Sequence, residues 1–362
     1  MTNMLPTVSL IYLSYFSEPF LEEVILSLEQ LDYPKEKIKL IFVDNASTDK
    51  SCDIIREKLV ARSGESFPEV LFFPQEENTG FAKGNNLGIN HALLDGTDYV
   101  YLHNNDAKLH KEAIKEAVLL AESDRQIGSV QSTMCLWQNE DILNSTGGMV
   151  HFLGFGYVRD NGSRQDSVQY KDGEEIAYAS GAAVLYRASA LREVGLLDPY
   201  LFLYHEDLEL GWRLRLAGYK NVLSTKSMVY HHYEFKRSIQ KFYWMERNRL
   251  LVHLSHLRWK TIFLLAPWLI GLEFALLPLS FKGGWFREKF FVWVAWLSPK
   301  TWKYLAKKRK ESAIIRRVKD KEIVRLFVGK IAHQDVASPI VDRFANPLLS
   351  FVWRLILPLI RW

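Results

Sequence analysis

Apolar strand-like segments alternate with segments of helical period through the first 135 residues of this chain. The helical stretches include Glu18–Leu31 and Ala82–Leu94. The strand-like segments are apolar on both faces, and they are Val8–Tyr15, Ile38–Val43, Val70–Phe73, Tyr99–Leu102 and Ile127–Gln131. Strands that read as continuous apolar runs between helices are typical of a parallel sheet covered on both sides. The pattern therefore predicts an α/β fold with helices on both faces of a parallel sheet.

Polar residues stand where several of these predicted strands end. They are Ser14 and Tyr15, then Asp44 and Asn45, then the region 78–80, and finally Asn104, Asn105 and Asp106. In open α/β sheets, ligands bind beyond the carboxyl ends of the strands. We therefore expect these four groups to meet at one ligand-binding edge.

An acidic segment opens a later predicted helix, Glu206–Ala217. Glu206, Asp207 and Glu209 stand there between apolar stretches. A buried carboxylate without a partner costs roughly several kcal/mol, which favours a chemical role for at least one of them. An acidic first turn also favours the positive end of the helix dipole, so a purely structural interpretation stays open on this segment alone.

Five motifs follow one another in chain order. They are Asp44-Asn45-Ala46-Ser47-Thr48-Asp49, Asn78-Thr79-Gly80-Phe81-Ala82-x-Gly84-Asn85-Asn86-x-Gly88, Asn104-Asn105-Asp106, Glu206-Asp207-x-Glu209-Leu210 with Arg213, and Val229-Tyr230-His231. The set resembles glycosyltransferase family 2 over residues 7–250, and its rhamnosyltransferase-like subgroup in the Asn-rich second motif and in Arg247-Asn248. The resemblance implies a GT-A fold, with a Rossmann-like nucleotide-binding sheet, and sugar transfer from a nucleotide donor with inversion.

The resemblance also implies roles for single residues. Asp207 matches the catalytic base, and Glu206 would orient the site or hold the acceptor. Asp44 matches the carboxylate that accepts the N3–H of uracil or thymine. The other residues expected at the nucleotide are Ser14, Tyr15, Asn45, Gly80, Asn86, Asn104 and Asn105. For Gly80 and Asn86, ordinary turn chemistry is the competing explanation.

Asp106 matches the last carboxylate of the family's metal-binding Asp-x-Asp element, but Asn104 stands at the first position. This departure leaves one protein carboxylate and predicts weaker binding of Mg²⁺ or Mn²⁺, the hard cations that oxygen ligands suit. His231 matches a histidine that joins the metal or diphosphate in some members. A structural role for His231 stays open, with His232 as the substitute ligand.

The last third of the chain differs in character. The run 261–280 is long and apolar enough to cross a bilayer, but Glu273 and two prolines argue against a simple span. Basic residues gather over 303–321, and residues 345–362 are apolar with two arginines. We expect a catalytic domain over 1–235 and a helical, membrane-associated region over 236–362. A buried helical subdomain or a dimer interface are the alternatives.

The remaining expectations concern partners and location. No basic segment precedes the first apolar run, and only Cys52 and Cys135 occur, so we expect the cytoplasmic face of the cell membrane. The expected donor is dTDP-L-rhamnose or a UDP-sugar, and the acceptor is a polysaccharide or lipid-linked glycan of the cell envelope. No nucleic acid is expected, and no oligomeric state is predicted. The rivals are a silent sugar-binding or membrane scaffold, and a nucleotidyltransferase, whose basic phosphate loop is missing from residues 14–17.

Overall fold

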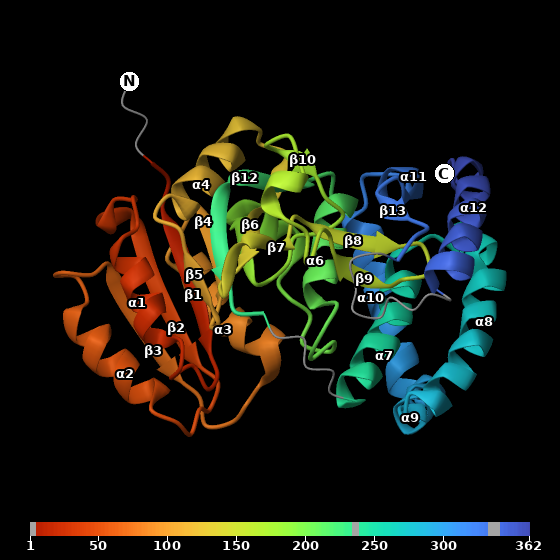
Figure 1. Ribbon diagram of the computed structural model, residues 1–362, viewed down its shortest axis with the longest axis horizontal. Coiled ribbons are helices and arrows are strands. Elements are labelled where there is room, and N and C mark those ends of the chain that lie inside the picture. Colours follow the sequence, from red (N-terminus) through yellow and green to blue (C-terminus); the bar gives the residue numbers. More distant parts are fainter. Residues whose placement is uncertain (1–4, 234–238, 332–340) are drawn as a thin grey trace.

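A mixed ten-stranded sheet forms the centre of the computed structural model, which describes residues 5–233, 239–331 and 341–362 (Figure 1). Its main order is β10-β12-β6-β11-β4-β1-β2-β3, while β5 pairs with β12 and β7 pairs with β6. The strands are β1 Val8–Ser14, β2 Ile38–Asp44, β3 Glu69–Pro74, β4 Tyr99–Asn104, β5 Ala107–Leu109, β6 Ile127–Leu136, β7 Asn139–Ser145, β10 Glu174–Glu175, β11 Ala183–Arg187 and β12 Lys220–His231.

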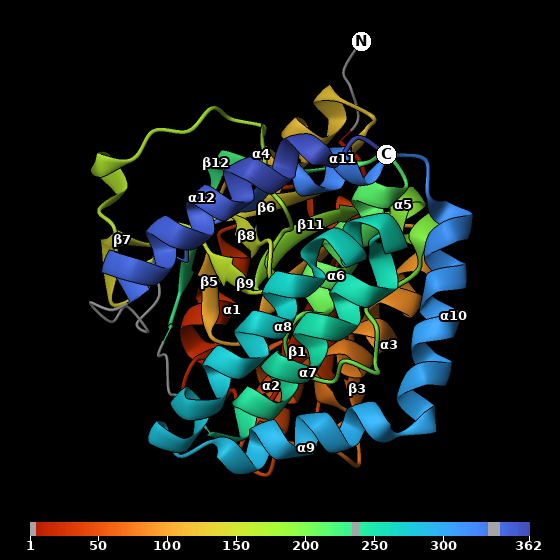
Figure 2. The same cartoon turned by 90° about the vertical axis from the view of Figure 1, so that its right-hand side faces the viewer.

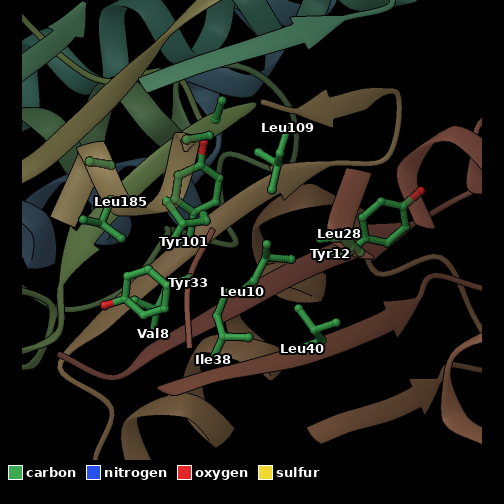
Figure 3. Close-up of a cluster of buried hydrophobic side chains, with 14 of the residues drawn as sticks. Val8, Leu10, Tyr12, Leu28, Tyr33, Ile38, Leu40, Tyr101, Leu109 and Leu185 are labelled. Atoms are coloured by element: carbon green, nitrogen blue, oxygen red, sulfur yellow. The ribbon is translucent and has the colours of Figure 1, made fainter. Parts of the chain in front are cut away.

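Two hydrophobic layers flank the sheet, because successive side chains of a strand point to opposite faces. Leu10 and Tyr12 of β1 belong to the layer shown in Figure 3, which includes residues of α1 Leu21–Glu29, α2 Ser51–Lys58 and α4 Ala113–Ser123. Ile11 and Leu13 belong to the opposite layer, which includes residues of α3 Gly80–Leu94, α5 Ala188–Val194 and α6 Glu206–Leu216. Helices thus cover both faces, as the apolar strands predict.

The prediction of a wholly parallel sheet is wrong for part of it. Strands β4, β1, β2 and β3 are parallel, but β11 is antiparallel to both of its neighbours, β4 and β6. After β6 the chain continues beyond the carboxyl edge through β7, and it re-enters from that same edge. Asn104 N–H at the end of β4 donates to the carbonyl of Ala182, 2.9 Å away, just before β11 begins. A strand that enters from the carboxyl edge has to run against β4.

A second, three-stranded sheet joins the region after β6 to the last third of the chain. Its order is β13-β8-β9, formed by Phe327–Val328, Gly148–His151 and Gly156–Val158. The last third is otherwise helical: α7 Ile239–His256, α8 Trp259–Lys282, α9 Phe286–Leu297, α10 Pro299–Ile315, α11 Asp320–Val324 and α12 Asn346–Ile356. These helices gather at the end of the molecule opposite β1–β3 (Figure 1). The expected domain boundary at residue 235 lies outside the described residues and stays a prediction.

Short helical turns complete the chain. Lys35–Lys37, Val60–Arg62, Gln165–Ser167 and Leu357–Leu359 are 3₁₀ turns, and Val341–Ala345 is a π turn. A third hydrophobic cluster contains residues of α6, α7, α8 and α12 together with β8 and β13. The helical region therefore shares a core with the helix that begins at Glu206.

Candidate active site

The Asp44 carboxylate is fixed at the end of β2. Ser14 Oγ at the end of β1 donates to its Oδ1 at 2.9 Å, and Ser47 donates to it through Oγ (2.6 Å) and N–H (2.9 Å). Asp44 is buried, and its pairing partner in the sheet register is Ser14. The two strand ends therefore hold a rigid acceptor at the carboxyl edge of the sheet.

Asn45 connects this strand end to the start of α3. Its Oδ1 accepts from Thr79 N–H at 2.9 Å, and its Nδ2 donates to Asn78 Oδ1 at 2.9 Å. Gly80 then begins α3 with φ +81°, and a Cβ there would lie 3.0 Å from the Phe202 ring. Glycine is required at this turn both for the left-handed backbone and for the close approach of Phe202.

Asn105 joins the end of β4 to the segment after β1. Its Nδ2 donates to the Tyr15 carbonyl at 2.9 Å and to Ser17 Oγ at 3.2 Å, and Ser17 Oγ donates to Ser14 Oγ at 3.0 Å. The Tyr15 side chain is 43% exposed. The ends of β1, β2 and β4 thus form one hydrogen-bonded edge, with an accessible aromatic ring beside it.

Asp106 and His231 meet although 125 residues separate them. Asp106 Oδ1 lies 3.0 Å from His231 Nε2 and accepts from Asn104 Nδ2 at 3.0 Å. His231 Nδ1 lies 2.9 Å from Asn144 Oδ1, which can only accept. Asn144 therefore requires the N–H on Nδ1, so a hydrogen bond from Nε2 to Asp106 needs the second proton of the charged ring.

The pair has the donor set of a weak divalent-cation site. Burial alone would raise the pKa of Asp106, but the hydrogen bond and charge of His231 outweigh it and hold that pKa below its usual value. A carboxylate oxygen and an imidazole nitrogen suit Mn²⁺, and Asp106 alone suits Mg²⁺. Among the residues that the structure describes, no three His, Cys, Asp or Glu gather around a common point. Most ligands of a cation here would have to come from the diphosphate and water.

Among the described residues, none forms an ion pair with Asp207 or Glu206 at the start of α6. Asp207 accepts hydrogen bonds from the N–H groups of Gly181 (3.1 Å) and Leu208 (2.7 Å). Glu206 is 6% exposed, and its Oε2 has no hydrogen-bond partner within the described part of the chain. Burial and then the charge of Asp207 raise the pKa of Glu206 to about 8, and burial raises the pKa of Asp207 as well. Such a pair can take up a proton near neutral pH.

The loop that leads into this pair has a strained backbone. Phe202, Tyr204 and His205 have φ values of 61°, 64° and 69°, a region that costs non-glycine residues energy. Asn248 on α7 holds the loop, since its Nδ2 lies within 3.0 Å of three loop carbonyls, those of Leu201, Leu203 and Tyr204.

Arg247 supports this clamp from the same turn of α7. Its guanidinium donates to Asn248 Oδ1 (Nε at 3.0 Å, Nη2 at 2.8 Å) and to the Tyr200 carbonyl at 2.6 Å. It also lies over the Trp244 ring, 4.5 Å from its centroid. The sequence offers Arg247 and Asn248 only as a point of family resemblance. The structure gives Asn248 a positioning role, and no spacing along the chain could have indicated it, nor the Asn144–His231 contact.

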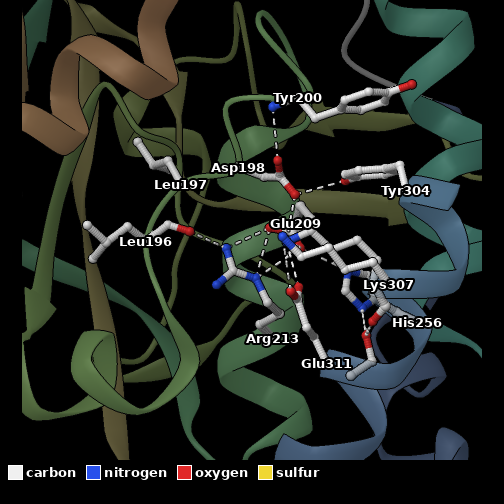
Figure 4. Close-up of polar contacts among 12 residues, drawn as sticks. Leu196, Leu197, Asp198, Tyr200, Glu209, Arg213, His256, Tyr304, Lys307 and Glu311 are labelled. Atoms are coloured by element: carbon white, nitrogen blue, oxygen red, sulfur yellow. Dashed lines mark hydrogen bonds and ion pairs between the residues drawn. The ribbon is translucent and has the colours of Figure 1, made fainter. Parts of the chain in front are cut away.

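Glu209, one turn along α6, sits among cations (Figure 4). Arg213 Nη2 lies 2.7 Å from it, His256 Nε2 3.2 Å and Lys308 Nζ 4.0 Å. Burial would raise the pKa of Glu209, but the charge of Arg213, the hydrogen bond from His256 and the charge of Lys308 outweigh it and lower the pKa well below its ordinary value. Lys308 and the Tyr304 hydroxyl also bind Asp198. Arg213 is therefore paired to the acidic cluster, and Glu209 ties α6 to α7 and α10.

Strand order brings most of the expected site residues to one edge. Asp44 ends β2, Ser14 ends β1, Asn104 ends β4, and Gly181 with Ala182 leads into β11, and these four strands are neighbours. Asp207 contacts Gly181, and Asp106 contacts Asn104, whose N–H reaches Ala182. Asn86 is placed differently. Its amide donates to the Leu197 carbonyl (2.7 Å) and accepts from the Leu197 N–H (3.2 Å), which makes it a bridge between α3 and the loop after α5.

A cavity of about 570 Å³ lies at the other end of the strands. Residues at the amino ends of β1 and β2, such as Val8 and Ile38, line it. None of the expected site residues is among its lining residues, which carry charges of both signs. The chemistry of the carboxyl edge, and not the size of this cavity, locates the candidate site.

Two glycosyltransferases are similar to this chain in sequence. The chain is similar to an N-acetylglucosaminyl-diphospho-decaprenol L-rhamnosyltransferase of Mycobacterium tuberculosis, at 26% identity over 253 residues that make up 64% of this chain and 77% of that protein. It is also similar to the low-salt glycan biosynthesis hexosyltransferase Agl10 of Haloferax volcanii, at 22% identity over 216 residues, 59% of this chain and 63% of that protein.

Solved structures share the fold. One is the mannosyltransferase PcManGT from Pyrobaculum calidifontis in complex with GDP-Man and Mn²⁺, with a TM-score of 0.52 and 16% identity over 86% of this chain and 87% of that one. Another is S. aureus TarS 1–349 in complex with UDP, with a TM-score of 0.51 and 16% identity over 97% and 88% of the two chains. A model of the family described as glycosyltransferase like family 2 matches residues 6–250. The chain therefore belongs to this glycosyltransferase family and has its GT-A fold.

Proposed function

We propose that this protein transfers a sugar, with inversion, from a nucleoside-diphosphate donor to a hydroxyl group of a lipid-linked or polysaccharide glycan. The observation that carries the proposal is the convergence of Asp44, Asp106 and Asp207 on one edge of the sheet, where no described residue forms an ion pair with Asp207. A half-buried carboxylate whose described partners are backbone N–H groups is suited to proton transfer.

In the proposed reaction, Asp207 takes the proton of the acceptor hydroxyl. The hydroxyl oxygen forms a bond to the anomeric carbon from the face opposite the diphosphate. The bond between that carbon and the diphosphate oxygen breaks, and the nucleoside diphosphate leaves with the electron pair. Glu206 keeps its own proton throughout the reaction. Asp44 accepts the N–H of a uracil or thymine base. Each of these steps uses a group at the same edge of the sheet.

Asp106 and His231 would hold Mg²⁺ or Mn²⁺, for which their oxygen and nitrogen atoms fit. A bound divalent cation stabilises the negative charge that develops on the leaving diphosphate. Two structural neighbours, PcManGT and GalNAc-T7, were solved with Mn²⁺, which supports a cation in this protein too. Asn104 at the position of a family carboxylate keeps the protein's share of the binding small.

The donor we propose is dTDP-L-rhamnose or a UDP-sugar, and the acceptor a lipid-linked glycan at the cytoplasmic face of the membrane. The mycobacterial relative is named for rhamnose transfer to a decaprenol-linked sugar, which supports both parts. TarS was solved with UDP and with UDP-GlcNAc, which supports a uridine donor. The described chain contains one helix, α8, that is long and apolar enough to cross a membrane.

A donor screen tests the proposal. Nucleoside diphosphates and their sugars are added to the full chain with and without Mn²⁺, and thermal unfolding and sugar release are measured. We expect UDP or dTDP compounds to raise Tm more with Mn²⁺ than without it, and more than CDP compounds do, because only uracil and thymine present an N3–H to Asp44.

Matched variants sharpen the screen. Asp106→Ala should lose the Mn²⁺-dependent part of the Tm rise, while Asp53→Ala, an exposed position on α2, should keep it. A chain that binds a donor but releases and transfers no sugar would support the silent scaffold instead. Release of diphosphate from a nucleoside triphosphate, without sugar transfer, would support a nucleotidyltransferase.

A further inference from the structure

Helix α8 has two unlike faces, although both are apolar. Its 18-residue apolar window has a mean hydropathy of 2.0, and only 17% of that window is buried. Phe263, Ile270, Phe274 and Phe281 form one stripe at helical spacing and are 57–72% exposed. The opposite stripe, with Ile262, Leu265 and Leu269, is buried in the core that it shares with α6, α7 and α12.

Ion pairs fasten the inward face of α8 to the protein. Glu273, at mid-helix, lies 2.7 Å from Arg249 Nη2 of α7 and 2.7 Å from Lys289 Nζ of α9. The side chains of both cations are at most 1% exposed, and both also pair with Glu246. A helix that crossed a bilayer would have to leave these contacts and carry Glu273 into hydrocarbon, which is strongly unfavourable.

The first turn of α8 is fastened as well. The N–H of Arg258 and the hydroxyl of Thr261 donate to Asp320 Oδ2, at 2.8 and 2.5 Å, and Trp362 Nε1 donates to Thr261 Oγ1 at 2.7 Å. The helix is therefore held at its start and its middle by polar contacts to α7, α9, α11 and the last residue of the chain. These contacts fit a helix that lies on the protein and not one that leaves it.

Two neighbouring helices extend the exposed apolar stripe. In Figure 2, α8 runs across the face toward the viewer, with α12 above it and α9 below it. Large apolar side chains that are 43–81% exposed recur at helical spacing on both neighbours, at Phe290, Val294 and Leu297 of α9 and at Leu348, Phe351 and Leu355 of α12. We call the exposed stripes of α8, α9 and α12 the apolar face. An exposed patch on this scale marks an interaction surface.

The charges around the apolar face are almost all positive. Exposed basic residues surround it, namely Arg258, Lys260, Lys282, Arg287, Arg343, Arg354 and Arg361. In the described residues from 258 onward, exposed acidic side chains are limited to Glu322 and Asp342. Anionic headgroups match this pattern, whereas a second copy of the same face would bring like charges together.

The hairpin of α8 and α9 packs on the first turn of α7. Phe242, in the first turn of α7, stacks on Trp285 just before α9, with ring centroids 4.8 Å apart. Helix α7 begins eight residues after β12 ends at His231, the neighbour of Asp106.

We infer that α8, α9 and α12 lie together in one leaflet of an anionic bilayer, as a monotopic surface, and that α8 does not cross it. The exposed stripes enter the boundary between headgroups and acyl chains, and the surrounding lysines and arginines bind lipid phosphates. That this contact presents a lipid-linked acceptor to Asp207 rests on the proposed function. The membrane contact itself does not.

Vesicle flotation of the full chain tests the surface. We expect binding to phosphatidylcholine vesicles that contain phosphatidylglycerol, and roughly tenfold or more weaker binding to pure phosphatidylcholine. Phe263→Glu with Phe274→Glu should lower binding at least about tenfold, because two exposed rings become charged. Leu94→Glu is the matched control, since Leu94 is 85% exposed on α3, and it should bind as the wild type does. Lys282→Glu with Arg287→Glu should weaken only the anionic preference, and Lys58→Glu on α2 should not.

A labelling experiment separates a surface helix from a span. Single cysteines replace Lys260 and Lys282, at the two ends of α8, in a Cys52→Ser chain, and an impermeant maleimide is added to inside-out and right-side-out membrane vesicles. We expect both ends to react in the same vesicle preparation. Reaction of the two ends in opposite preparations would overturn the inference, as would a dimer through this face without flotation. Donor hydrolysis by the glutamate variants distinguishes failure here from failure of the proposed function, because these residues do not contact the Asp44–Asp207 edge.

Discussion

Helix α6 carries two groups of carboxylates, one turn apart, whose electrostatic surroundings are opposite. At its start, Glu206 is buried and Asp207 is half-buried, and Asp207 accepts from two backbone N–H groups. No described residue forms an ion pair with either, and burial raises both pKa values. Glu209 is buried among Arg213, His256 and Lys308, and its pKa is lowered. Basic neighbours thus balance the negative charge of Glu209, whereas no described ion pair balances the charges of Glu206 and Asp207.

This difference indicates that Glu209 stabilises the fold and that Asp207 serves the chemistry. Arg213 on the same helix and Lys308 on α10 both contact Glu209 and form no ion pair with Glu206 or Asp207. An uncompensated carboxylate pair is unfavourable for stability, and the strained loop adds to that cost, which the hydrogen bonds from Asn248 partly offset. A protein retains such an arrangement where a poised base is required. Substitutions of these residues and of Asn248 test the difference between the two groups.

Asp207→Asn should have the largest effect. It keeps the shape of the side chain but removes the proton acceptor, so transfer should fall by roughly 10²–10⁴-fold. Steady-state transfer kinetics measure the loss, and calorimetry with the nucleoside diphosphate should give an unchanged Kd. Asp53→Asn, exposed on α2, is the control and should transfer normally. Full turnover in Asp207→Asn would remove the base from the account.

Glu209→Ala should damage stability and not chemistry directly. It leaves Arg213 and His256 buried without their carboxylate, a change that costs roughly 3–5 kcal/mol. Urea unfolding measures the loss against Glu57→Ala, which is exposed on α2 and should cost little. A small loss at Glu209 would mean that the two groups of carboxylates on α6 do not differ as described.

Glu206→Gln should instead stabilise the protein, increasingly so as pH rises. The folded-state pKa of Glu206, about 8, lies above its ordinary 4.5, so its contribution to stability is full below 4.5 and is lost as pH rises toward 8. Between these values the advantage of Gln should grow by up to roughly 1.4 kcal/mol per pH unit. Glu209→Gln should show no such slope, because the stability that Glu209 gains from its lowered pKa is constant above pH 4.5 and is lost only as pH falls below it. Unfolding curves for both variants across this pH range test the pair, and equal slopes would contradict it.

Asn248→Ala should have the smallest effect, roughly 1–3 kcal/mol, since three loop carbonyls lose their donor. Because the loop sets the position of Asp207, kcat should fall while the KM for the donor stays near normal. Asn90→Ala, exposed on α3, is the control. A rise in donor KM with unchanged kcat would mean that the clamp serves nucleotide binding instead.

Local pattern predicts much of this protein, and long-range contacts explain what it misses. The apolar runs predict β1, β2 and β4, and the polar residues after them identify the ligand edge, because both signals lie within one strand. The antiparallel β11 is missed, since its direction depends on where the chain re-enters the sheet. Asn144 and Asn248 are missed for a related reason: each acts on a residue more than 40 positions away. Asn86 illustrates the converse, because its motif predicts a nucleotide contact while its amide bonds Leu197.

A crystal structure of the protein with UDP or dTDP and Mn²⁺, read by anomalous scattering, tests the central claim most directly. We predict a manganese peak within bonding distance of Asp106, with the diphosphate beside it and the base at Asp44. The terminal phosphate should face Asp207. A nucleotide bound in the cavity at the amino ends of β1 and β2, or a manganese ion away from Asp106, would contradict it.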